Sequence, residues 1–291
     1  EIYQYYDAKI LEYKAVRDGI YWHYHPASFS GNAHRMGYNY SYSENLHNEI
    51  ISRRIIDHMW FPVANRPGGH IETFDINAWL EQWIPFDYSN QSTYDINLEQ
   101  SDANRFGDWR RAPLTWQCYH PDHDDYQKVG NCRRWTARCL NIGTRTRLLT
   151  MDDIDLAFKE VRKNKPAILS FANHDYRDMR SDVEYVQRLV KNVKAEFPDV
   201  LTKYSGAENA AISLLGYVDK PKIKLSATLE NSRLCTEVIQ GEIFGPQPFL
   251  AIKMKDGTYY HDNFDVIEPR KKWVYVLDTL TVQMHDIATI G

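Results

Sequence analysis

Residues 150–175, TMDDIDLAFKEVRKNKPAILSFANHD, decide the fold class. Thr150 with Asp153 three residues later is a capping pattern, and it predicts a helix that begins there and runs to about Asn164. The apolar run at 167–172 then predicts a buried strand, which polar residues follow at once. Helices that alternate with buried strands are typical of parallel α/β sheets, whose carboxyl strand ends carry the chemistry in barrel enzymes.

The same alternation continues outward from this stretch in both directions. The further predicted helices span residues 7–18, 44–58, 75–83 and 182–196. The further predicted strands span residues 20–25, 61–64 and 84–87. Residues 90–147 are irregular, polar and aromatic, so no element is predicted there. We therefore expect a (β/α)-barrel portion over residues 1–217.

The pattern changes after Tyr217. Residues 218–291 consist of short segments rich in β-formers, and Lys255-Asp256-Gly257 is a hairpin turn signal. These features predict a small antiparallel β-sheet or sandwich domain. Its role stays open between carbohydrate binding, formation of a homo-oligomer and bracing of the barrel.

Composition excludes several classes of protein. The 291 residues carry a formal net charge of −4 and no long basic stretch, which argues against nucleic-acid binding. No apolar run approaches the roughly 20 residues that cross a bilayer, and no signal peptide is visible. The four cysteines form no CxxC pair, which is typical of reduced thiols and favours the cytoplasm, although the location stays open.

Two histidines stand at the end of the predicted strand 20–25. Side chains two apart on a strand face the same side, so His23 and His25 can converge on one metal ion. The alternative is that they only form interior hydrogen bonds. Arg66 opens the turn Arg-Pro-Gly-Gly and can hold a carboxylate through a bidentate pair, although such a stretch is also an ordinary turn.

Two further polar positions follow predicted strands. Asp87 ends an aromatic-rich strand, where it is either a catalytic carboxylate or a cap residue. His174 follows the apolar strand 167–172 and can act as a general acid, with Asp175 and Asp178 near enough to raise its pKa. A structural histidine is the alternative.

Taken in order, these short stretches resemble the later motifs of the polysaccharide deacetylase (NodB-like, carbohydrate esterase) family. The motifs are H-x-H-P at 23–26, R-x-G-G at 66–69, W-x-x-x-D at 83–87 and an apolar strand followed by Asn-His at 173–174. The resemblance implies a (β/α) barrel in which His23 and His25 ligate the metal. It also implies that Arg66 supports the catalytic carboxylate, that Asp87 tunes His174, and that His174 protonates the leaving group.

The chain departs from the family pattern in two ways. The histidine pair of the family is usually more widely spaced, although some relatives carry the H-x-H-P form. The opening carboxylate motif, which supplies the base and a metal ligand, has no counterpart before His23, because Asp7 precedes a predicted helix. Either an N-terminal piece is absent from this chain, or the domain has lost catalysis.

Aromatic residues offer a candidate sugar platform. Rings stack on sugar faces, so Trp83, Trp109, Trp116 and Tyr119 are candidate substrate-binding residues, with core packing as the alternative.

The resulting hypothesis is a Zn²⁺-dependent hydrolase (or one that uses another divalent metal) that removes an acyl group, such as acetyl, from an N- or O-acylated sugar. One alternative is a catalytically inactive carbohydrate-binding or assembly protein on the same scaffold. Another is a glycosidase, which needs two carboxylates flanking a groove, for which Asp87 and Asp175 are the candidates.

Overall fold

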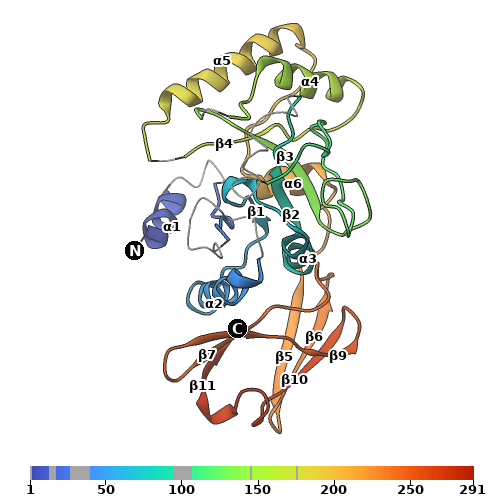
Figure 1. Ribbon diagram of the computed structural model, residues 1–291. Coiled ribbons are helices and arrows are strands. Elements are labelled where there is room, and N and C mark those ends of the chain that lie inside the picture. Colours follow the sequence, from blue (N-terminus) through green and yellow to red (C-terminus); the bar gives the residue numbers. More distant parts are fainter. Residues whose placement is uncertain (1, 13–17, 27–39, 95–106, 145, 175) are drawn as a thin grey trace.

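A curled parallel sheet forms the centre of the protein (Figure 1). The computed structural model describes residues 2–12, 18–26, 40–94, 107–144, 146–174 and 176–291. The strands are β1 (Ala64–Asn65), β2 (Phe86–Asn90), β3 (Trp135–Asn141) and β4 (Ser170–Ala172). They pair in sequence order, all parallel, and Trp22 bridges Asn65 at the free edge of β1. The described strands form a half-barrel and not the closed barrel that the sequence predicts.

Six helices surround this sheet in the described part of the chain. Their bounds are α1 (Ile2–Glu12), α2 (Ser41–His58), α3 (Phe74–Trp83), α4 (Met151–Arg162), α5 (Arg180–Glu196) and α6 (Ala207–Leu214). The predicted cap of α4 is present, because Thr150 and Asp153 form a reciprocal capping box. Single 3₁₀ turns are formed by Gly68–His70 and Met284–Asp286.

The observed elements differ from the prediction at three places. Strand β3 lies in the stretch for which no element is predicted, and the predicted strand 20–25 is reduced to the single bridge at Trp22. The predicted helix 7–18 is observed as α1, which ends at Glu12, and residues 13–17 lie outside the described part.

The C-terminal residues form two antiparallel sheets, as predicted. One sheet has the order β5 (Lys224–Glu230), β6 (Arg233–Gln240), β10 (Lys272–Val276) and β9 (Asp265–Glu268). The other has the order β11 (Ile287–Ile290), β7 (Leu250–Met254) and β8 (Tyr259–Asp262). The hairpin turn between β7 and β8 places Gly257 at φ 90°, which favours glycine. Leu234, Ile252 and Trp273 belong to one shared core, so the two sheets pack as a small sandwich.

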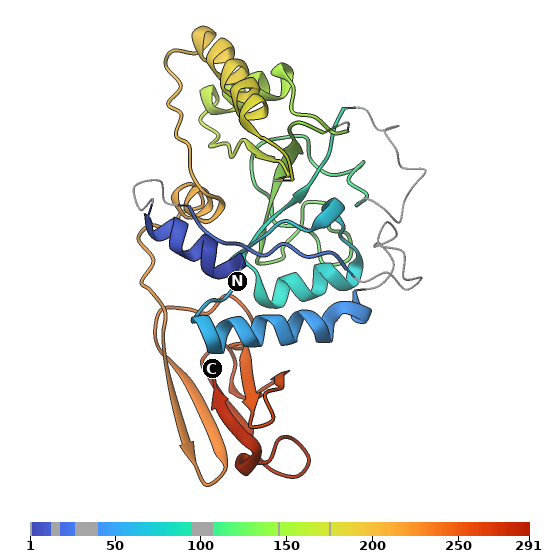
Figure 2. The ribbon, with the colours of Figure 1, turned by 90° about the vertical axis from the view of Figure 1, so that its left-hand side faces the viewer.

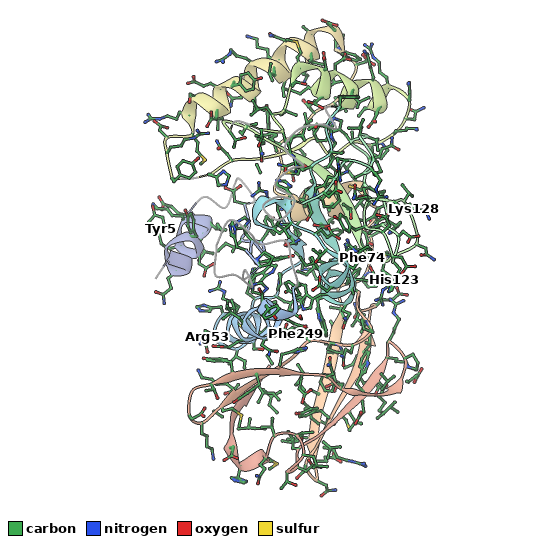
Figure 3. All side chains as sticks on the ribbon, viewed as in Figure 1. Tyr5, Arg53, Phe74, His123, Lys128 and Phe249 are labelled. Atoms are coloured by element: carbon green, nitrogen blue, oxygen red, sulfur yellow. The ribbon has the colours of Figure 1, made fainter. Side chains whose placement is uncertain are left out.

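The second of these sheets packs directly on α2. Both ribbon views place α2 and α3 between the parallel sheet and the C-terminal strands (Figures 1 and 2). Asp57 of α2 binds Lys253 Nζ at 3.1 Å and Tyr259 Oη at 2.7 Å. Phe249, labelled in Figure 3, stacks on His261 with ring centroids 3.9 Å apart and meets Trp83 edge-on. The sandwich is therefore attached to the α/β portion through packed side chains.

Candidate functional site

Polar side chains from four strand ends gather at the carboxyl edge of the parallel sheet. His23 follows the Trp22 bridge, Arg66 follows β1, Asn141 ends β3, and His174 follows β4 by two residues. His23, Arg66 and His174 line one cavity of about 960 Å³. The parallel order of the strands explains this convergence, because all of their carboxyl ends point to the same edge.

The two predicted metal ligands face each other. His23 Nε2 lies 3.3 Å from His25 Nε2, and His23 Nδ1 donates to the Arg66 carbonyl oxygen at 2.6 Å. That bond assigns the proton to Nδ1 and leaves the lone pair of Nε2 pointing toward His25. Burial lowers the pKa of His23 to about 4 and also lowers the pKa of His25, so both rings are neutral at pH 7.

This spacing fits a metal-ligand pair. Two nitrogens that each lie about 2.0–2.1 Å from a tetrahedral Zn²⁺ are about 3.3–3.4 Å apart. A single N–H···N hydrogen bond between the rings would give a similar distance. Within the described residues no third His, Cys, Asp or Glu joins the pair, so the chain as described supplies two nitrogen ligands.

The Arg-Pro-Gly-Gly turn supports His25. A Cβ atom built on Gly68 would lie 2.2–2.4 Å from three atoms of the His25 ring, so only glycine leaves room for the imidazole there. The Gly68 amide also donates to the Tyr24 carbonyl oxygen at 2.7 Å. The turn therefore fixes the position of the second histidine.

The Arg66 side chain is directed into the site rather than toward a carboxylate. Its Nη2 donates to His70 Nε2 at 2.8 Å and to Asn141 Oδ1 at 3.4 Å. His70 must then carry its proton on Nδ1, which donates to the Ser89 carbonyl oxygen at 3.0 Å. Burial and the Arg66 charge hold the pKa of His70 well below its usual value. The Arg66 guanidinium also interacts with the Cys139 thiol, and its buried Nε has no hydrogen-bond partner within the described residues.

His174 lies close to the histidine pair. The two residues His174 and His23 line the same cavity, and the pKa values of His23 and His25, lowered mainly by burial, are lowered further by the electrostatic effect of His174. The His174 amide donates to Asn173 Oδ1 at 2.8 Å, and Asn173 Nδ2 donates to Asp182 at 2.8 Å.

The two carboxylates predicted beside His174 are placed differently. Asp178 pairs with Arg180 at 2.7 Å on an exposed surface. Asp175 lies outside the described residues.

Asp87 lies below the edge of the sheet, in a buried polar cluster. The residue is fully buried as the second residue of β2, and it does not line the cavity. Its carboxylate accepts from Ser89 Oγ and from Asn65 Nδ2, the latter at 3.2 Å, and lies 3.8 Å from Arg134 Nε. Arg134 also pairs with Glu72. This arrangement gives Asp87 three partners that the sequence did not indicate, and none of them is His174.

The four candidate sugar-binding aromatics are buried. Trp109 and Trp116 are each 1% exposed, Trp83 is 5% exposed and Tyr119 is 6% exposed. Trp116 donates to the Asp153 carbonyl oxygen and lies under the Arg138 guanidinium, while Trp83 packs on Phe249. A ring covered on both faces cannot stack on a sugar, so these contacts support the alternative, core packing.

Comparison of the chain with protein-family models, with curated proteins and with solved structures gives no match. None of the helices in the described ranges is long and apolar enough to cross a membrane.

Proposed function

We propose that the protein is a metal-dependent hydrolase that removes an acyl group from a polar substrate such as an acylated sugar. The observation that carries the proposal is the pair of neutral imidazoles whose Nε2 atoms lie 3.3 Å apart, one of which, His23, lines the cavity. His23 and His25 would hold the metal, with Zn²⁺ preferred by these nitrogen ligands. A bound Zn²⁺ supplies Lewis-acid polarisation of the acyl carbonyl.

The residues around the pair have distinct roles in this proposal. The Arg66 guanidinium, which lines the cavity, would donate a hydrogen bond to the substrate oxygen, in a setting shielded from water where such a bond is strong. Water adds to the acyl carbon, and His174 gives a proton to the departing amine or alcohol as the acyl bond breaks. The proton of the attacking water needs a carboxylate base, which the family resemblance assigns to the opening motif that has no counterpart before His23.

A second function, carbohydrate binding without catalysis, is favoured by one observation. The described residues provide no third protein ligand beside the histidine pair. A protein that uses the same cavity only to bind a carbohydrate would need no third metal ligand.

Metal content separates the two functions. We would measure zinc by elemental analysis in the purified wild-type protein, in the double variant His23→Ala/His25→Ala and in the control His58→Ala, which changes an exposed histidine at the end of α2. Near-stoichiometric zinc in wild type and control, lost in the double variant, supports the hydrolase. Absence of metal from all three proteins rejects the metal-dependent mechanism and leaves the binding function.

Acyl release then tests the reaction itself. Wild-type protein loaded with zinc should release acid from an N-acylated glucosamine, and His174→Gln should lower kcat by about 10²–10⁴-fold. The zinc content of His174→Gln should stay unchanged, because His174 acts on the leaving group and not as a ligand. Wild-type activity in this variant would remove His174 from the mechanism.

A further inference from the structure

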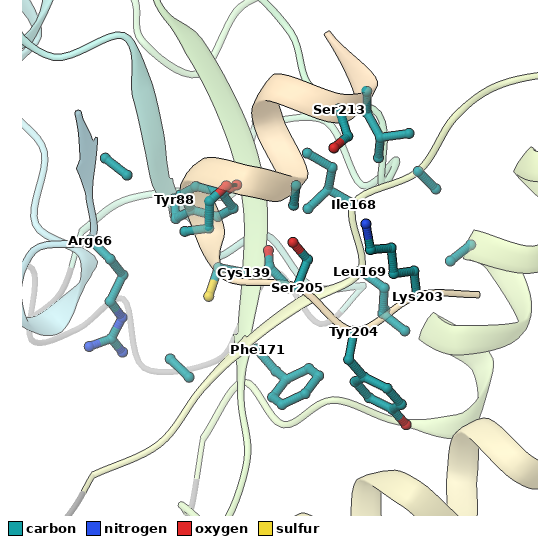
Figure 4. A pocket seen from close by; sticks show the side chains of 18 of the residues that line it. Arg66, Tyr88, Cys139, Ile168, Leu169, Phe171, Lys203, Tyr204, Ser205 and Ser213 are labelled. Carbon is teal, nitrogen blue, oxygen red and sulfur yellow. Dashed lines mark hydrogen bonds between the residues drawn. The ribbon is translucent and has the colours of Figure 1, made fainter. Parts of the chain in front are cut away.

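The cavity continues beyond the polar groups of the site into an apolar chamber. Figure 4 shows Arg66 at one side and Leu169, Lys203 and Tyr204 at the other, with Cys139 between them. The whole cavity has a volume of about 960 Å³, and a two-carbon acetyl group would fill only a small part of it. The space therefore exceeds what removal of an acetyl group needs.

Carbon atoms from four segments wall this chamber. They belong to α4, to β4 with the chain that leads into it, to α5 and to α6. The wall includes the side chains of Phe158, Val161, Leu169, Phe171, Val190 and Leu214. A concave site with a mostly apolar lining and a few polar groups at one end is the common form of a small-molecule pocket.

Apolar side chains form part of the rim of the chamber, beside the exposed polar residues Thr202, Lys203 and Ser205. Leu201 and Tyr204 line the cavity yet are 94% and 66% exposed, and Met179 and Leu214 are more than a third exposed. Apolar side chains that cluster at the surface around an opening are typical of a binding site for an apolar group. The rim and the wall thus favour the same class of ligand.

We propose that this chamber binds a long, unbranched apolar chain. A second part of the proposal rests on the proposed function: the apolar chain is the acyl chain of the substrate. The carbonyl group of that chain would then lie beside His23, Arg66 and His174. His23, Arg66 and His174 line the same cavity, and Figure 4 places Arg66 opposite Leu169 and Tyr204. An acyl chain whose carbonyl lies beside Arg66 would therefore extend past Cys139 toward Leu169 and Tyr204. Each additional buried CH₂ group should raise affinity by about fourfold.

Calorimetry with decanoate and acetate tests the chamber directly. We expect wild-type protein to bind decanoate, below its micellar concentration, at least about tenfold more tightly than acetate, with a negative heat-capacity change. The variant Ser213→Trp places an indole at a cavity-lining position on α6 whose side chain is exposed, so the fold should tolerate it.

Ser213→Trp should weaken decanoate binding at least tenfold. Its matched control is Ser181→Trp on α5, also exposed but not among the lining residues, which should bind like wild type. Decanoate binding no tighter than acetate binding, or equal affinity in Ser213→Trp and wild type, would overturn the inference.

Measuring the acid released from N-acetylglucosamine and from N-decanoylglucosamine separates failure of the chain-binding chamber from failure of the hydrolase. Cleavage of both substrates without decanoate binding retains the hydrolase and rejects the chain-binding chamber. Decanoate binding as expected, without cleavage of either substrate, rejects the hydrolase and retains the chamber. Preference for the decanoyl substrate that Ser213→Trp abolishes supports both proposals.

Discussion

At the scale of single residues, Gly68 packs tightly against the His25 ring. The spacing of the histidines suggested a shared target, and the structure adds that a glycine from another segment makes room for one of them. No pattern along the sequence connects positions 25 and 68, because the contact depends on how β1 lies beside the Trp22 bridge.

Gly68→Ala should therefore weaken metal binding while the protein stays folded. The added methyl group overlaps the imidazole and displaces His25, and we expect zinc affinity to fall about 10–100-fold, as for loss of other groups that orient a ligand. Competition with a chelating dye measures this change. Gly216→Ala, at φ 77° with no atom within 4 Å of its added Cβ, is the control and should bind zinc like wild type. Equal zinc affinity in Gly68→Ala and wild type would contradict the placement of His25.

The buried Arg134 is a second residue whose environment the sequence concealed. The pair Arg133-Arg134 indicates solvated or ion-paired side chains. Arg134 is ion-paired with Glu72 and Asp87, but it is also fully buried, which the sequence does not indicate. Burial raises the pKa of Glu72 well above its ordinary value, and the Arg134 charge opposes that rise.

Arg134→Met should lower the free energy of unfolding by about 3–5 kcal/mol, because it leaves two buried carboxyl groups without their cation. Urea denaturation measures the loss. The adjacent Arg133→Met is the control: the Arg133 side chain is 35% exposed, and its partner Glu81 keeps two backbone amide donors, so the cost should be about 1 kcal/mol. Similar losses in the two variants would show that the burial of the charge has no special effect.

At the scale of elements, helices were the most predictable part of the chain. Helix α4 has its capping box and an amphipathic pattern within its own residues, so local sequence suffices to predict it. Strand β3 could not be found in this way, because Arg138 stands in its middle. That guanidinium is buried by Asp153, the Ser92 carbonyl oxygen and the Trp116 ring, and two of these three partners lie more than twenty residues before it.

The buried face of helix α2 could likewise not be predicted from the residues of the helix alone. His47 looks like a surface residue in the sequence but is 4% exposed, packed against Trp22, Tyr24 and Tyr40. These partners belong to segments before the helix, so the helical period of α2 does not reveal them.

The buried His47 predicts a pH dependence of stability. Burial lowers its pKa to about 4 in the folded protein, against about 6.5 in the unfolded chain, so the unfolded state binds more protons between these values. Stability should fall by roughly 2–3 kcal/mol as pH decreases from about 6.5 to 4 on account of this residue. His47→Gln should reduce that slope in urea titrations, whereas His58→Gln should retain it. An unchanged slope in His47→Gln would show that His47 is not neutral in the folded state.

At the scale of the whole molecule, the C-terminal sandwich and the α/β portion share an interface. A sequence boundary near Tyr217 suggests two domains, and the antiparallel sheets do begin after it. Contacts of α2 and Trp83 with β7, β8 and Phe249 then join the two parts.

Phe249→Ala should destabilise both parts together, by about 2 kcal/mol, because it removes a ring that packs on Trp83, Phe61 and His261. Tryptophan fluorescence and far-UV circular dichroism should still give coincident unfolding curves. Val266→Ala, exposed on β9, is the control and should change stability by less than about 0.5 kcal/mol. Two separated transitions in the wild-type protein would show that the parts unfold independently.

The carboxyl-edge arrangement of the site also has a consequence for biosynthesis. The side-chain contacts there join residues as far apart as His23 and Arg66, 43 positions, and Arg66 and Asn141, 75 positions. Contacts between residues so far apart in the sequence form late, and they lower the rate of folding. On the ribosome, the pocket therefore cannot assemble until the chain has emerged past Leu214, the last residue of its lining. The face of α2 that meets β7 and β8 is covered later still. A nascent chain exposes that face to chaperones throughout this interval.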